Sequence, residues 1–257
     1  MKNPSIKNLI IVLITLFFFS ILFIVPAKLI TNAYSKEAND CKSLKKFSIQ
    51  RTICETKSLG GGVTDLLKKK KTDTGGAKFD MKNANTGLVK TFFESSNNYL
   101  QAQELLLIAY GKNTEAAQVK EAIAYAKDSG VSDEKKMKNS IKVTTEASKT
   151  IETSMNDQSY QLTAEGKASY AKSLPYLGKG IMGTARLKPQ AQMMIANIQS
   201  DPMNAFAQIG GLAKVIPNMP GYIKTITSTS KLIITGAKAK KIEGSDSLDK
   251  TMNNLAL

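Results

Sequence analysis

The 257-residue sequence contains no histidine and no tryptophan, and it has only two cysteines. Without histidine, Ser-His-Asp and Cys-His catalysis, histidine-based zinc sites and haem ligation by histidine are all excluded. The Glu-x-x-His ligands of di-metal carboxylate bundles are missing for the same reason. We therefore expect no enzymatic activity, no metal and no other cofactor.

Arginine is also scarce, because Arg51 and Arg186 are the only arginines among 36 basic residues. The net charge of +15 is therefore carried almost entirely by lysine, a hydrated point charge without the fork that recognises phosphate in bidentate fashion. This favours diffuse attraction to anionic surfaces over specific nucleic-acid recognition. Lysines scattered over solvated helix faces by an AT-biased coding sequence would explain the same excess. The candidate surface contacts are Lys68, Lys69, Lys70, Lys71, Lys238, Lys240 and Lys241.

A long apolar run near the start of the chain predicts export. Leu9 to Val25 carries no charge, Lys2 and Lys7 precede it, and small residues follow it. These are the parts of a secretory signal, so we expect a periplasmic or secreted protein. The length of the run does not decide between cleavage and retention as a membrane anchor, but cleavage is favoured because a spanning segment of roughly 20 residues would have to recruit Ala27, Leu29 and Ile30 across Lys28. Retention would leave the body anchored to the inner membrane and outside the cytoplasm.

Cys41 and Cys54 are predicted to form a disulfide bond in that oxidising compartment. The alternative, a redox-active thiol pair, normally has the shorter Cys-x-x-Cys spacing.

Composition divides the chain into four parts. The expected parts are a signal or anchor at 1–33, a disulfide-tied, partly irregular region with a Gly/Lys-rich linker at 34–84, a helical bundle at 85–243, and a weakly ordered tail at 244–257.

The fold class is predicted to be all-α, an antiparallel helical bundle. From Leu88 onward, apolar doublets recur every seven residues at Phe92-Phe93, Tyr99-Leu100 and Leu106-Leu107, which is typical of one broad helical stripe. Short connections between amphipathic helices favour antiparallel neighbours. Further helices are predicted at 114–129, 132–156, 160–177, 189–198, 203–216 and 222–237. The β-branched residues of 226–235 leave a strand open there.

Two short motifs resemble functional sites without the context that such sites need. Residues 178–183 match G-x-G-x-x-G, but a helical segment precedes them where a nucleotide site needs a buried strand, so a helix–helix turn is expected. Pro175 and Gly178 are expected to break or bend the preceding helix. Ser169 and Lys172 form one of several S-x-x-K strings that a lysine-rich chain acquires by chance.

The function expected from these patterns is non-catalytic: binding, scaffolding or accessory work in the cell envelope. The expected partner is an envelope protein, an anionic envelope polymer or a small apolar ligand. A membrane-active or pore-associated protein that uses the basic amphipathic segment 203–241 on an anionic membrane is the alternative, and a histidine-free hydrolase comes third. Tyrosines suited either to a ligand pocket or to packing are Tyr99, Tyr110, Tyr160, Tyr170, Tyr176 and Tyr222.

The predicted disulfide is tested by counting thiols in unreduced protein taken from the periplasm. We expect no free thiol per chain, because Cys41 and Cys54 pair in an oxidising compartment. Two reactive thiols per chain would show that the pairing is wrong.

Overall fold

The structure, a computed structural model, describes residues 79–157 and 159–255. All regular elements in these two ranges are helices, and neither range contains a strand, which confirms the all-α prediction. The elements are α4 (Met81–Ala109), α5 (Asn113–Lys127), α6 (Asp133–Asn156), α7 (Ala164–Ser200), α8 (Pro202–Ile209), α9 (Leu212–Val215), the 3-10 helix η2 (Ile216–Asn218), α10 (Met219–Ala239) and α11 (Ser245–Asn254).

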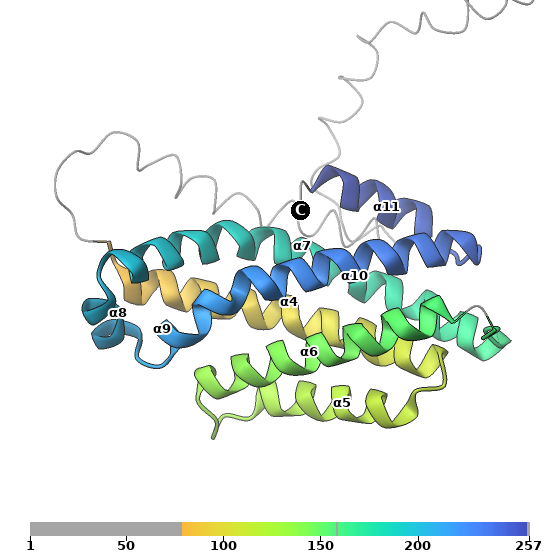
Figure 1. Ribbon diagram of the computed structural model, residues 1–257, viewed down its shortest axis with the longest axis horizontal. Helices are drawn as coiled ribbons and strands as arrows, with labels where there is room; N and C mark the ends of the chain where they lie inside the picture. Colours follow the sequence, from red (N-terminus) through yellow and green to blue (C-terminus); the bar gives the residue numbers. More distant parts are fainter. Residues whose placement is uncertain (1–78, 158, 256–257) are drawn as a thin grey trace, which may run out of the picture. The chain divides into compact units, whose positions relative to one another are not determined.

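Helices α4 and α7 lie at the centre of the helical packing. Helix α4 contacts α5, α6, α7 and α8, whereas α7 also contacts α10 and α11. Successive long helices reverse direction, and α8 and α9 connect the end of α7 to the start of α10 (Figure 1). The arrangement leaves two helix pairs at the surface, α5 with α6 and α7 with α10.

Helix α4 follows the predicted apolar stripe. Phe92, Tyr99 and Leu106 are fully buried, as expected from their seven-residue spacing. The helix begins earlier than predicted, at Met81, because Asp80 caps it: its Oδ1 accepts a hydrogen bond from the backbone N–H of Asn83 at 3.0 Å.

Residues 178–183 lie inside α7, so the expected turn there is wrong. Gly180 and Gly183 instead allow close approach to α4, where a β-carbon on Gly180 would lie 3.0 Å from Tyr99 Cβ. The Ser95 hydroxyl donates to the Gly180 carbonyl at 2.9 Å and lies 2.9 Å from the Thr184 hydroxyl. Helix α7 thus gains backbone-to-backbone packing on α4.

The proline expectations for α7 also fail. The helix continues through Pro175 instead of breaking there, and Pro189 lies inside it instead of at the start of a new helix. Each proline removes one backbone donor. Since α7 packs along α4, tertiary contacts outweigh that loss.

The connection from α7 to α10 consists of several short helices, whereas the sequence predicts one helix at 203–216. Asp201 caps α8, with its Oδ1 3.1 Å from the backbone nitrogen of Asn204, and Pro202 occupies the first turn. The helix ends at Ile209 because Gly210 has a φ of 55°, a conformation that suits glycine. Residues 226–235, where a strand was left open, belong to α10.

Helix α11 lies where the sequence predicts a weakly ordered tail. It carries Leu248 and Met252, which are buried, and it contacts α7 and α10. Two apolar side chains in a polar ten-residue helix give a weak periodic signal, and only the neighbouring helices make their burial possible.

The signal or anchor at 1–33, the region at 34–78, the disulfide of Cys41 with Cys54 and the lysines at 68–71 lie outside the described residues. Among the helices that are described, none combines the length and hydropathy needed to cross a membrane.

The close approach of α4 and α7 is tested by Gly183→Ala. The added methyl group would lie 2.7 Å from Ser95 Cβ, so we expect a loss of about 1–3 kcal/mol in the free energy of unfolding. In the control Gly87→Ala, nothing lies within 4 Å of the new carbon, and a gain of about 0.5–1 kcal/mol is expected. Urea denaturation measures both, and equal gains in the two variants would contradict a tight contact.

Candidate functional site

The charge is divided between two halves of the helical part. Residues 80–157 contain ten lysines and eleven acidic residues, which nearly balance. Residues 166–242 contain eleven basic residues and a single acid, Asp201, whose carboxylate caps α8. The positive potential of this part of the chain therefore originates mainly from α7 and α10.

A groove lies between α7 and α10 with a volume of about 410 Å³. Ala191 and Ile223 are buried at its base, while Pro220 and Thr227 contribute further carbon surface. Among the described residues, no carboxylate lines this groove. The lining residues are Lys188, Ala191, Gln192, Pro220, Ile223, Lys224, Thr227, Ser228 and Lys231.

Three lysines, Lys188, Lys224 and Lys231, stand around this groove, which we call the lysine-rimmed groove. Lys224 and Lys231 are seven residues apart on α10, so they lie on one face about 10 Å apart along the axis. Both are exposed, and within the described residues neither takes part in a salt bridge. Lys188 comes from α7 on the opposite side. The lysine-rimmed groove thus offers carbon surface beside positive charge.

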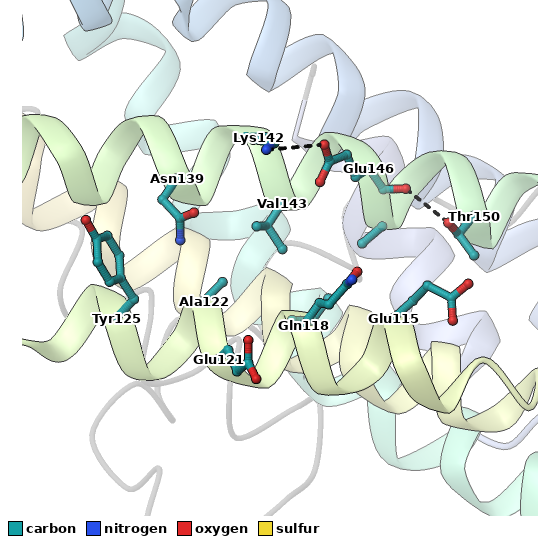
Figure 2. A pocket seen from close by; sticks show the side chains of 12 residues that line it. Glu115, Gln118, Glu121, Ala122, Tyr125, Asn139, Lys142, Val143, Glu146 and Thr150 are labelled. Carbon is teal, nitrogen blue, oxygen red and sulfur yellow. Dashed lines mark hydrogen bonds and ion pairs between the residues drawn. The ribbon is translucent and has the colours of Figure 1, made fainter.

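A second groove, between α5 and α6, has a similar volume of about 420 Å³ but a different chemistry (Figure 2). Glu115, Glu121 and Glu146 line it together with Lys142, whose ammonium lies 4.0 Å from Glu146. Tyr125 lies at one end of the groove. Three carboxylates against one ammonium leave this groove negatively charged, in contrast to the lysine-rimmed groove.

The six predicted tyrosines mostly serve as packing. Tyr99, Tyr170 and Tyr222 are buried in the core, and the Tyr170 hydroxyl donates to the Ile233 carbonyl at 2.6 Å. Tyr176 is half-buried and packs against the core. None of these four lines a described pocket.

Tyr110 and Tyr160 differ, because both line a hollow of about 310 Å³ beside α6. Their ring centroids are 5.6 Å apart. Lys112, Lys149 and Asp157 also line the hollow, so its charges are mixed.

Polar side chains lie in the core where α4 meets α6 and α10. Burial raises the pKa of Tyr99 to about 12, and the neighbouring Ser148 and Ser230 hydroxyls offset part of the rise. None of them has good hydrogen-bond geometry with Tyr99 Oη. Burial likewise raises the pKa of Tyr222. These phenols are held in their neutral form and are therefore structural.

The predicted C-terminal lysines differ in their surroundings. Lys238 lies 2.8 Å from Asp249 of α11, and this hydrogen-bonded pair raises the pKa of Lys238. Lys238 thus helps to hold α11 against α10. Lys241 is exposed and Lys240 half-buried after the end of α10, apart from the lysine-rimmed groove.

The sequence reasoning missed Lys188, Lys224 and Lys231 as a group. The acid-free stretch from 166 to 242 and the seven-residue spacing of Lys224 and Lys231 are visible in the sequence. The pairing of α7 with α10, which brings Lys188 to the same groove, is not.

Within the described ranges, no group of histidine, cysteine or acidic residues is arranged to hold a metal ion. A comparison of the chain with protein families, with curated proteins and with solved structures finds no match.

The buried phenols predict a loss of stability in alkali. In the unfolded chain tyrosine has a pKa of about 10, so above pH 10 the unfolded state releases protons that the folded state retains. The free energy of unfolding must then fall as the pH rises from about 10 towards 12. Tyr99→Phe is expected to make this fall shallower, whereas the exposed control Tyr125→Phe leaves it unchanged. Denaturation at pH 9 to 11, with the absorbance at 295 nm, measures both. Titration of all tyrosines near pH 10 in folded protein would contradict the expectation.

Proposed function

We propose that this protein is a non-catalytic, exported binding protein of the cell envelope, and that its lysine-rimmed groove binds an anionic amphiphile. The ligand class is a single apolar chain that ends in a carboxylate or phosphate. The observation that carries the proposal is the groove itself, in which Lys188, Lys224 and Lys231 surround an apolar base and none of the described lining residues is a carboxylate.

The size and lining of the groove support a small ligand. Its volume of about 410 Å³ falls within the range of ligand pockets, roughly 300–1,000 Å³. Burying an apolar chain on Ile223 and Ala191 is favourable at about 25 cal/mol per Å² of surface removed from water. Each lysine attracts an anionic head as a point charge without imposing the planar geometry of arginine, so it suits carboxylates and phosphates alike.

The proposal also includes the helix arrangement, the export segment and the disulfide. We infer an antiparallel bundle that is carried out of the cytoplasm by the segment at 1–33 and is joined to a region tied by Cys41 and Cys54. An amphiphile carrier fits that compartment, because anionic lipids and their breakdown products are plentiful in a cell envelope. The positive charge of α7 and α10 would raise the local concentration of such ligands.

The alternative, a membrane-active segment 203–241, has less support as a whole. Along α10 the apolar side chains of Ile226, Ile233 and Ile234 are buried in the core, so they would reach lipid only if the bundle opened. Helix α8 is the part of the segment with large exposed apolar side chains, Met203 and Phe206.

The third candidate, a histidine-free hydrolase, has the weakest support. Among the S-x-x-K pairs, Ser228 and Lys231 lie in the lysine-rimmed groove, but the Ser228 hydroxyl donates to the Thr225 carbonyl at 3.1 Å. A nucleophilic serine would instead need its hydroxyl directed at a base.

The proposal is tested by isothermal titration calorimetry of the protein with dodecyl phosphate below its micelle concentration. We expect binding, and a loss of about three- to tenfold in affinity when Lys224→Gln is combined with Lys231→Gln, since two exposed charges leave the rim. Dodecanol should bind more weakly than dodecyl phosphate to the unmodified protein.

The matched control combines Lys120→Gln with Lys127→Gln, a pair with the same seven-residue spacing on the exposed face of α5. It removes the same charge from the chain but leaves the lysine-rimmed groove intact, so the affinity should stay unchanged. No binding of dodecyl phosphate, or equal losses in the two double variants, would show that this groove is not the site.

A further inference from the structure

Helix α8 and its flanks form a nearly uncharged end of the helical part. Residues 189–213 include one charged side chain, Asp201, and its carboxylate caps the helix. In Figure 1 this helix lies at the end where α7 finishes and α4 and α6 begin. The end of the bundle is thus defined by α8 and by the starts of two long helices.

Helix α8 is apolar on both of its sides. Ala205 and Ile209 are buried against the bundle, while Met203 is 83% exposed and Phe206 43% exposed on the other side. Between them, Gln208 Nε2 donates a hydrogen bond to Asn204 Oδ1 at 2.9 Å. Removing the large apolar side chains of Met203 and Phe206 from water is favourable, so this outer face is suited to an apolar contact.

Lysines surround the same end. The ammonium of Lys214 lies 5.6 Å from the centroid of the Phe206 ring. Glu134 at the start of α6 is paired with Lys138 at 2.6 Å, and Lys214 and Lys135 also act on its carboxylate and lower its pKa. Lys214 therefore places a positive charge beside the exposed ring of Phe206, and Lys135 and Lys138 lie near Glu134.

We propose that the α8 end binds the surface of a membrane that contains anionic lipid, with Met203 and Phe206 entering the interface and Lys214 facing lipid headgroups. Apolar side chains backed by lysine are the combination that holds interfacial helices on such surfaces. This inference does not rest on the lysine-rimmed groove, since different residues carry it.

A lipid surface fits this end better than a second copy of the chain does. Two copies that met through α8 would bring their basic halves together, and the net charge of +15 makes that contact repulsive. An anionic bilayer presents negative charge above a continuous apolar layer, which complements both features at once.

The first test is oxidative footprinting of the full chain by mass spectrometry. In solution Met203 should oxidise readily because it is 83% exposed. With vesicles of phosphatidylcholine and phosphatidylglycerol we expect at least about a fivefold slower oxidation of Met203, while Tyr125 on α5, 36% exposed, keeps its rate. Vesicles of phosphatidylcholine alone should protect Met203 less.

The site-resolved measurement separates α8 from any other part of the chain that binds vesicles. If the protein sediments with anionic vesicles while Met203 oxidises at its solution rate, α8 is not the docking surface. Failure to bind either kind of vesicle would also overturn the proposal, and protection of Met203 by a protein partner alone would assign the face to that partner.

The second test combines Met203→Ser with Phe206→Ser. We expect about a tenfold lower affinity for anionic vesicles, because two apolar side chains no longer enter the interface. The control combines Ile108→Ser with Tyr125→Ser, which removes side chains of comparable exposure, 41% and 36%, from α4 and α5. Equal affinity of the two double variants would contradict the proposal.

The variant in the lysine-rimmed groove, Lys224→Gln with Lys231→Gln, should retain protection of Met203, so the two proposals can fail separately.

Discussion

The packing of α4 against α7 is the contact on which the rest of the helical part depends. Gly180 and Gly183 lack a side chain where the two helices meet, so backbone atoms of α7 lie against Tyr99 and Ser95 of α4. The Ser95 hydroxyl donates to a carbonyl of α7 across this contact. Each glycine costs helix propensity, yet the close approach brings the flanking apolar side chains into full contact. Helix α7 can then extend over 37 residues, past two prolines, because it packs along α4.

That long helix also determines where the charge lies. One side of α7 faces α4, and another faces α10, which leaves Lys188 beside Lys224 and Lys231 across the lysine-rimmed groove. Helices α5 and α6, whose acidic and basic residues nearly balance, pack on α4 and form a groove of their own, where Lys142 lies beside Glu146. The basic side chains and the charge-balanced side chains therefore lie on different surfaces because of the way in which the helices pair. Helix α8, with its exposed Met203, adds a nearly uncharged surface at one end of the helical part.

The sequence predicts the helical class and most of the helix positions, because the apolar spacing in α4, α5 and α6 is regular. It fails where local signals conflict with tertiary packing. Gly178 to Gly183 indicates a turn and Pro189 a helix start, but both lie within α7 because α4 covers that stretch. The tyrosines are correctly singled out as apolar bodies with polar tips, yet whether each one packs or lines a hollow depends on its neighbours. Lys224 and Lys231 carry a visible spacing that gains meaning only when Lys188 joins them.

By itself, the sequence determined the helical periodicity, the lack of histidine chemistry and the near absence of acidic residues between residues 166 and 242, because these are properties of composition and of spacing along one chain. The tertiary structure decided which surfaces those residues form. Residues on α7 and α10 meet across a groove, and Met203 and Phe206 remain exposed although Ala205 and Ile209 of the same helix are buried. Contacts between residues distant in the chain depend on which helices pair, and that pairing results from close packing at Gly180 and Gly183, which no local pattern encodes.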